Sequence, residues 1–342
     1  MKWKGGFVCE FIEIESEKRH DRDQGGGVHG NAIFSKYDLD FRVLDHKHQP
    51  FDWDKDGDKL NEPRKGRRVT LVAEIKTSFG PPILCYCVHL EVFCGLIGRV
   101  NQFSEILSDS VIHASTHPYQ LILGDLNTKS HSIARLSSFS RDRYCVLSLG
   151  MSESEWWDKN LLSWHACSGD TNVYLQYVLT DARNPGFYDP WHPSYDVTMK
   201  YPKHYALYSA KLDWTLVRGF DVINRWKGND DYSASDHKYL MVEVVFDDYS
   251  IASDTEGMAW TVWQMRRKEW KKRLEKDVES KRARGGKGRE LLENGYKDRL
   301  FELTAFVGGR DVIFSHMDNL WDEMEKSGSA NKLKLRDGQT GK

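Results

Sequence analysis

The chain has 342 residues, of which 39% are hydrophobic and 12% aromatic, and its formal net charge is -2. This length suits one large domain with an appendage or two modest domains, and the composition can build a sizeable core. The charge balance excludes a body coated with positive charge for nucleic acid, and there is no apolar run of about 18 residues to span a membrane.

Residues 6–14 predict a strand, because polar and apolar residues alternate in them, and residues 31–39 begin a second strand that turns at 36–38. A glycine-rich loop separates the two, and a long polar connection follows the second. Residues 69–77 and 82–90 predict a further pair of strands. The Gly-Pro-Pro turn at 80–82 joins them as antiparallel neighbours.

One helix is predicted over 95–115, followed by a buried strand over 119–127. The apolar residues of the helix recur at helical spacing: Ile97, Val100, Phe103, Ile106 or Leu107, and Val111. Residues 131–139 predict a short helix, and residues 143–150 are interpreted as extended.

The next part of the chain, 155–208, is rich in aromatic residues and has little periodicity. Its segment 184–205 is either a substrate-facing insertion with rings that stack on bases, or a packed irregular loop. Strands are predicted over 210–219 and 237–247, and the chain becomes helical from about residue 258.

Strands that mix with helices and antiparallel turns indicate an α+β or α/β layered domain over 1–249, with a helical appendage over 250–342. Residues 266–289 of this appendage hold 12 Lys/Arg against 4 Asp/Glu. Three interpretations of this basic helix stay open: contact with nucleic acid, contact with an anionic membrane surface, or a solvated helix docked by its tryptophans.

The first residues lack the apolar stretch of a signal peptide, so we expect an intracellular, cytoplasmic protein, with an organelle address upstream of Met1 left open. Six cysteines occur without a Cys-x-x-Cys pair. This usage is typical of free thiols in a reducing compartment and argues against a zinc site.

Several polar residues lie at the ends of predicted strands, where a sheet delivers side chains to one shared cleft. They are His89, Asp125, Asn127, Asp213, Asp236 and His237. Each alone is also typical of a structural role, as a turn former or a loop cap. Together they supply what phosphate-ester hydrolysis needs: carboxylates that hold Mg²⁺ or Mn²⁺, histidines that move protons, and an amide that steadies phosphoryl oxygens.

Five motifs in order resemble those of the endonuclease/exonuclease/phosphatase superfamily, which has the DNase-I-like fold. They are GNAIFSK (30–36), HLEVFCGLIGRVNQ (89–102), LILGDLN (121–127), KLDWTLVRG (211–219) and SASDHKYLMVEV (233–244). The resemblance covers roughly residues 5 to 247. It implies an α+β fold, a four-layer α/β/β/α sandwich, with the cleft at one sheet edge.

The resemblance also implies roles for single residues. His237 would be the general base or the stabiliser of the pentacovalent state, oriented by Asp213, and His89 would contact the scissile phosphate. Asp125 and Asn127 would position the nucleophile or leaving group. Of the remaining residues, the motif positions imply that Asp236 helps to hold the metal, that Asn31 lines the cleft, and that Glu10 pairs with the first histidine.

One family element has no counterpart in this sequence. The family begins with a strand, a helix and a second strand that ends in a glutamate, the principal metal ligand, and all of these would precede residue 6. We therefore expect a domain that lacks its first strands, either a fragment or a degenerate copy, with weak or no activity as the chain stands.

Two functions from different classes follow from these observations. The first is a Mg²⁺-dependent phosphoesterase in the complete protein, which cuts phosphodiesters or phosphomonoesters of nucleic acid, lipid or small molecules. The second is a non-catalytic binding or scaffold protein on a decayed nuclease-like fold. The retained set of polar residues at strand ends favours the first.

Overall fold

The computed structural model describes residues 8–14 (backbone only), 29–52, 67–128, 152–163, 183–201 and 208–247, with five helical positions between 268 and 279. The expected short helix at 131–139, the extended segment at 143–150 and most of the basic helix lie outside these residues. No helix among the described residues is long and apolar enough to cross a membrane.

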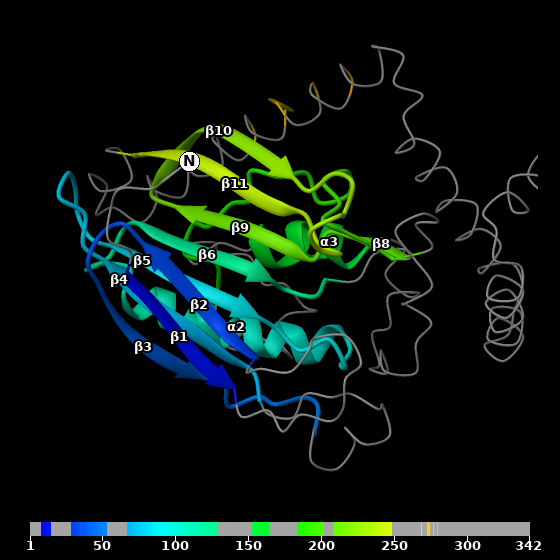
Figure 1. Cartoon of the computed structure of the whole chain (residues 1–342), viewed down its shortest axis with the longest axis horizontal. Coiled ribbons are helices and arrows are strands. Elements are labelled where there is room, and N and C mark those ends of the chain that lie inside the picture. Colours follow the sequence, from blue (N-terminus) through cyan, green and yellow to red (C-terminus); the bar gives the residue numbers. More distant parts are fainter. Residues whose placement is uncertain are drawn as a thin grey trace, which may run out of the picture.

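A five-stranded mixed sheet, in the order β3-β4-β5-β6-β9, forms the centre of the fold (Figure 1). Its strands are β3 (Leu39–Asp45), β4 (Val69–Ile75), β5 (Ile83–His89), β6 (Gln120–Asp125) and β9 (Asp213–Arg218). Only β5 and β6 are parallel, and the other neighbours are antiparallel. The predicted antiparallel pairing of 69–77 with 82–90 and the predicted α+β class are both confirmed.

Among the described residues, three two-stranded sheets accompany the central sheet, and the shortest of them pairs β7 (Met199–Tyr201) with β8 (Tyr208–Ala210). The antiparallel pair β1 (Val8–Ile14) and β2 (His29–Ser35) crosses one face of the sheet (Figure 1). There Ile33 packs on Leu71, Ala73 and Cys85. The second pair is β10 (Phe220–Gly228) and β11 (Tyr239–Phe246), which continues beyond β9.

Helix α2 (Leu96–Ile112) covers the opposite face of the sheet (Figure 1). Its buried apolar residues are Leu96, Val100, Phe103, Ile106 and Leu107. They join sheet residues such as Tyr86 and Ile122 in one core cluster. The short helices α3 (Glu153–Trp156) and η5 (Trp157–Leu162) add Trp157, whose ring centroid lies 5.2 Å from that of Phe103.

The sequence-based element bounds were wrong in three places. Strand β3 lies between the turn expected at 36–38 and the polar connection expected from residue 44, and it was missed although apolar and polar residues alternate from Leu39 to Val43. Strand β10 was missed altogether, and its pattern is interrupted by an irregularity between Val222 and Asn224. Val111 does not belong to the buried stripe of α2, since it is 40% exposed.

A carboxylate on α2 fastens the segment that follows β3. Glu105 accepts hydrogen bonds from the main-chain N–H groups of Lys47 and His48, and its oxygens also lie within hydrogen-bond distance of the His46 and His48 rings. Burial raises the pKa of Glu105, but these hydrogen bonds outweigh it and lower the pKa to about 2, from an ordinary value of 4.5.

This carboxylate predicts an acid-sensitive component of stability. The folded-state pKa lies below the unfolded value, so the stabilisation is complete above about pH 4.5 and is lost as the pH falls towards 2. Glu105→Gln should therefore lower the free energy of unfolding at pH 7 and flatten its decline between these values. Urea unfolding at a series of pH values measures this, with the exposed Glu243→Gln as the control. A parallel decline in wild type and Glu105→Gln would contradict it.

Candidate active site

Three adjacent strands bring His89, Asp125 and Asp213 into one row across one end of the strands. His89 is the last residue of β5 and is the register partner of Asp125, the last residue of β6. Asp213 is the first residue of β9, and because β9 runs antiparallel to β6, it is the partner of Asp125 on the other side. The register alone therefore places these residues side by side.

Main-chain hydrogen bonds hold the strand ends together. Leu90 N–H donates to the carbonyl of Asp125 at 2.9 Å, and Leu126 N–H donates to the carbonyl of Leu212 at 2.8 Å. Gly124 has a φ of 132°, and a Cβ there would lie 2.1 Å from the carbonyl oxygen of Val88. Only glycine tolerates this conformation and approach, so the Gly-Asp sequence is needed to pass Asp125 out of the core.

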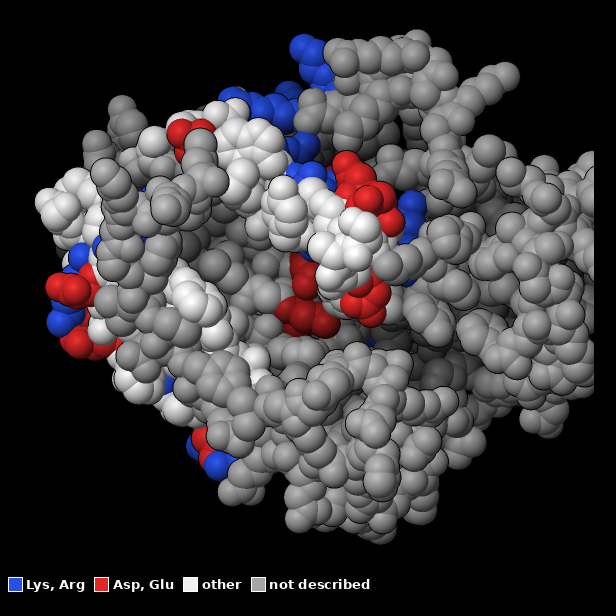
Figure 2. All heavy atoms as spheres, in the orientation of Figure 1, with Lys and Arg blue, Asp and Glu red and all other residues white. Residues whose placement is uncertain are grey.

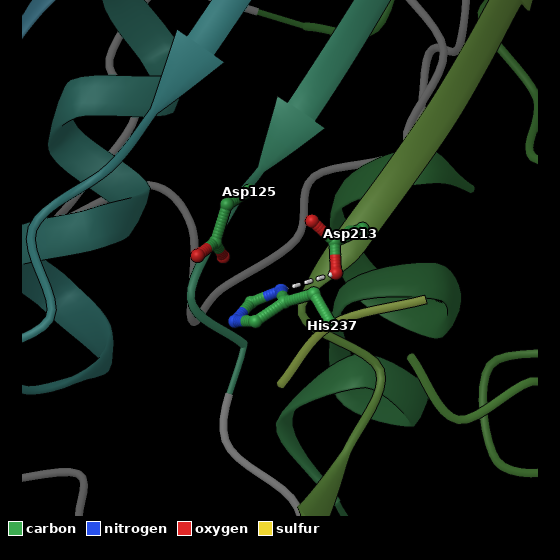
Figure 3. Close-up of side chains that lie close together, drawn as sticks. All are labelled: Asp125, Asp213 and His237. Atoms are coloured by element: carbon green, nitrogen blue, oxygen red, sulfur yellow. Dashed lines mark hydrogen bonds and ion pairs between the residues drawn. The ribbon is translucent and has the colours of Figure 1, made fainter. Parts of the chain in front are cut away.

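His237 completes the cluster from the loop between β10 and β11. Its Nδ1 lies 2.8 Å from Oδ2 of Asp213, and the ring lies between the carboxylates of Asp213 and Asp125 (Figure 3). Ligand atoms of Asp125, Asp213 and His237 all lie within 4.8 Å of one another. His89 Nε2 is 3.7 Å from Oδ2 of Asp125.

The proximity of these groups shifts their pKa values. Burial raises the pKa of Asp125, the charge of Asp213 raises it further, and partial compensation from His237 leaves it at about 7. Burial lowers the pKa of His237, but the hydrogen bond and charge of Asp213, with a contribution from Asp125, outweigh this and raise it to about 9. At neutral pH the cluster therefore contains an imidazolium held by a carboxylate, beside a second carboxyl group that titrates near neutrality.

The surface around the cluster is acidic. Figure 2 shows acidic atoms at the bottom of a hollow and others at its rim. The loop that carries His237 also contains Asp230, Asp231 and Asp236, all exposed. An anionic phosphate ester is repelled by such a surface unless a cation compensates the charge.

The donor set fits a hard divalent cation. Two carboxylates that converge within 4.8 Å of an imidazole offer the oxygen ligands that Mg²⁺ and Mn²⁺ prefer, with water in the remaining positions. No glutamate joins this cluster among the residues that the structure describes. We therefore expect the cation to be held by Asp125 and Asp213.

The other predicted site residues lie around this row. The Asn127 N–H donates to Oδ1 of Asp125, and its side-chain amide donates to the Leu90 carbonyl. The strand was expected to run through both residues, but β6 ends at Asp125 and Asn127 has a left-handed φ of 51°. Asn127 thus fixes the ends of β5 and β6 by hydrogen bonds to main chain and to Asp125.

Asn31, Asp236 and Glu10 lie outside the cluster of converging ligand atoms. Asn31 is buried, and its amide donates to the carbonyls of Val69 and Cys87 on β4 and β5. Asp236 is exposed, and its charge contributes to the raised pKa of His237. Glu10 is the register partner of Ile33 on β2, and its side chain lies outside the described part.

The sequence did not indicate the residue that holds the His237 loop. The amide of Asn229 donates to the carbonyls of Ser235 and His237, and its Oδ1 accepts from the Ala234 N–H. Asn229 also has a φ of 65°, in the left-handed region that asparagine tolerates. The available signal was the Gly-Asn-Asp sequence at the end of a strand, which is typical of a turn.

The model of the Endonuclease/Exonuclease/phosphatase family matches residues 3–237. No curated protein matches the chain.

Solved structures share little sequence with it. An endonuclease/exonuclease/phosphatase from Beutenbergia cavernae is 16% identical, with 70% of this chain and 53% of that chain covered and a TM-score of 0.42. The chain thus spans about half of that protein. ANGEL2, a 2',3'-cyclic phosphatase, is 13% identical (70% and 74% covered, TM-score 0.41). The mannosyl-6-phosphatase Bt3783 of Bacteroides thetaiotaomicron is 12% identical (70% and 77% covered, TM-score 0.37).

Proposed function

Because the chain belongs to the endonuclease/exonuclease/phosphatase family, we propose that its Asp125–Asp213–His237 cluster is the site of a divalent-metal-dependent phosphoesterase. The observation that carries the proposal is the 2.8 Å contact of Asp213 with His237, beside a second carboxylate on the neighbouring strand. A histidine oriented by one acid and facing another is an arrangement suited to moving a proton at a phosphorus centre.

His237 and Asp213 act as a pair. The Asp213 carboxylate fixes the ring so that Nδ1 carries a proton, and Nε2 lies on the side of Asp125 (Figure 3). As an imidazolium, His237 stabilises the negative charge that develops on the phosphoryl oxygens. As a neutral ring, it takes the proton of the attacking water. The raised pKa of His237 favours the imidazolium role at neutral pH in the protein without substrate.

A bound Mg²⁺ or Mn²⁺ would polarise the phosphoryl oxygens and offset the negative charge of the site. Asp125 and Asp213 would hold it, and the charge of Asp236 adds to the attraction. His89, which is 25% exposed and neighbours Asp125, would contact the scissile phosphate. Asn127 keeps Asp125 in place through its N–H donor.

The chemistry of the cluster suits a phosphate ester as the reacting group. The molecule that carries this ester is a nucleic acid, a lipid or a small phosphoester, and the cluster does not distinguish among them. We also propose an anionic partner for the predicted basic helix 266–289, because its excess of Lys and Arg would attract negative charge. Its Lys268, Lys272, Arg273 and Lys276 are helical and exposed.

Hydrolysis of bis(p-nitrophenyl) phosphate and p-nitrophenyl phosphate by the full chain tests the proposal. We expect slow hydrolysis of at least one ester with Mg²⁺ or Mn²⁺, none with EDTA, and a loss of about 100-fold or more in Asp125→Asn. Asp230→Asn is the matched control, because it removes the same charge from a residue that is paired with Lys238 outside the cluster. Hydrolysis that survives EDTA, or is absent with every cation, contradicts the proposal. The second of these results favours a non-catalytic binding protein.

A further inference from the structure

A buried threonine lies between the two segments that carry Asp213 and His237. Thr198 is 0% exposed and follows an irregular, aromatic-rich segment that begins at residue 183. The Thr198 hydroxyl oxygen lies 3.0 Å from the main-chain nitrogen of Leu212 and 3.0 Å from that of Asp213. One side-chain oxygen therefore accepts two N–H groups at the start of β9, one of them from the acid of the proposed site.

The main chain of Thr198 also contacts the segment that carries His237. The Thr198 carbonyl accepts the N–H of Lys238 at 2.7 Å, and the neighbouring Met199 forms an isolated β-bridge with His237. The Thr198 N–H donates to the carbonyl of Ala210 at 3.0 Å. Thr198 thus connects the chain before Asp213 with the chain after His237.

A local bend of the chain requires this hydroxyl. Successive N–H groups of an extended strand point in opposite directions, yet those of Leu212 and Asp213 converge on one oxygen. The bend lies at Leu212, directly before Asp213, whose carboxylate lies close to both Asp125 and the ring of His237. Without the hydroxyl, two N–H donors in a buried environment lose their acceptor, and the chain must shift to find another.

The segment that delivers Thr198 is itself anchored to β10. The buried carboxylate of Asp196 lies 2.8 Å from Nζ of Lys227 and accepts the N–H of His192 at 2.8 Å. Arg225 approaches the same carboxylate at 3.6 Å. These contacts anchor Asp196, two residues before Thr198, to strand β10.

We propose that Thr198 is a positioning residue, whose hydroxyl sets the Asp213–His237 hydrogen bond that the proposed phosphoesterase site depends on. This inference rests on the proposed function for its effect on turnover, but not for its effect on the hydrogen bond. Thr198 touches neither substrate nor cation. It acts through the main chain of Asp213.

Two nearly isosteric variants test the role of the hydroxyl. Thr198→Val keeps the shape and removes the acceptor, and Thr198→Ser keeps the acceptor. Thr77→Val is the control. It removes a hydroxyl hydrogen bond to the Gly80 carbonyl, at the strand ends opposite the cluster. If Thr198→Val does not fold, Thr198→Cys replaces it, since a thiol is only a weak acceptor.

The first readout is the Nδ1–H proton resonance of His237 in ¹⁵N-histidine-labelled protein. We expect a far-downfield signal in the wild type, Thr198→Ser and Thr77→Val, and its loss or upfield shift in Thr198→Val. The second readout is hydrolysis, where kcat should fall about 10- to 100-fold in Thr198→Val with KM little changed, because misplacement of a reacting group by about 1 Å has effects of this size.

The two readouts separate failure of this inference from failure of the proposed function. An unchanged His237 resonance in a folded Thr198→Val protein overturns the inference, whatever the activity. A lost resonance in a protein whose wild type hydrolyses no ester supports the positioning role of Thr198 and contradicts the phosphoesterase. Equal losses in Thr198→Val and Thr198→Ser also overturn it, because the hydroxyl would then not be the group responsible.

Discussion

His237→Ala is expected to lower kcat for ester hydrolysis by about 10²- to 10⁴-fold, the usual contribution of a positioned acid or base. His237 is the group of the cluster that can transfer a proton and carry positive charge, and Asp213 holds its ring at 2.8 Å. The His237 side chain is partly exposed and belongs to a loop. The substitution therefore leaves the core unchanged, and the fold should be retained. Steady-state kinetics at saturating Mn²⁺, with circular dichroism as the check of folding, measures this.

The chain offers a matched control for this substitution. His117 also contacts a carboxylate, since its Nε2 lies 3.0 Å from Glu74. It lies between α2 and the start of β6, at the strand ends opposite the cluster. His117→Ala should keep kcat within about twofold of wild type. Full activity in a folded His237→Ala protein would show that the cluster is not the catalytic centre.

The largest effect on stability is expected at a buried ion pair between α2 and α3. Arg99 on α2 and Glu153 on α3 are 0% and 1% exposed at their side chains, and Nη2 of Arg99 lies 2.7 Å from both carboxylate oxygens. Glu153→Ala leaves the guanidinium buried without its carboxylate partner. The free energy of unfolding should fall by about 3–5 kcal/mol, as is typical when one member of a buried pair is removed. Urea denaturation measures the difference.

Two further variants show whether the loss comes from the unpaired charge. The double variant Arg99→Met/Glu153→Leu replaces the pair by apolar groups and should recover much of the stability. Asp45→Ala breaks a surface pair in which the Arg67 side chain is 63% exposed and the Asp45 side chain 46% exposed, and should cost less than about 1 kcal/mol. A loss in Glu153→Ala no larger than in Asp45→Ala would refute the assignment of a strong buried pair.

The sequence predicted the row of site residues because strand ends are visible in local patterns. Apolar runs that stop at His89 and Asp125 marked the ends of β5 and β6, and Asp213 stood at the start of a third apolar run. What the sequence could not provide was the pairing of β6 with β9, which makes Asp213 the direct neighbour of Asp125. That pairing joins segments that are far apart in the chain.

The missed elements share a different cause, because they are defined by long-range or irregular contacts. Thr198 is recognised only through hydrogen bonds to residues 14 and 15 positions later, and a lone threonine in an aperiodic segment carries no local signal. Asn127 was expected to lie in an extended strand, but its own left-handed φ turns the chain after β6. Edge strand β3 was missed although apolar and polar residues alternate from Leu39 to Val43, because this short run stands between a turn and a polar connection and its pairing with β4 is long-range.

The most direct test of the account is where a divalent cation binds and whether it meets phosphate there. Electron paramagnetic resonance of Mn²⁺ added to the full chain with inorganic phosphate reports both, through the bound fraction and the ³¹P coupling. We expect a single bound Mn²⁺ with ³¹P coupling, strongly weakened in Asp125→Asn and Asp213→Asn and unchanged in Asp230→Asn. Mn²⁺ binding that is indifferent to Asp125 and Asp213, or no binding at all, would contradict the claim that this cluster is a metal-dependent phosphoesterase site.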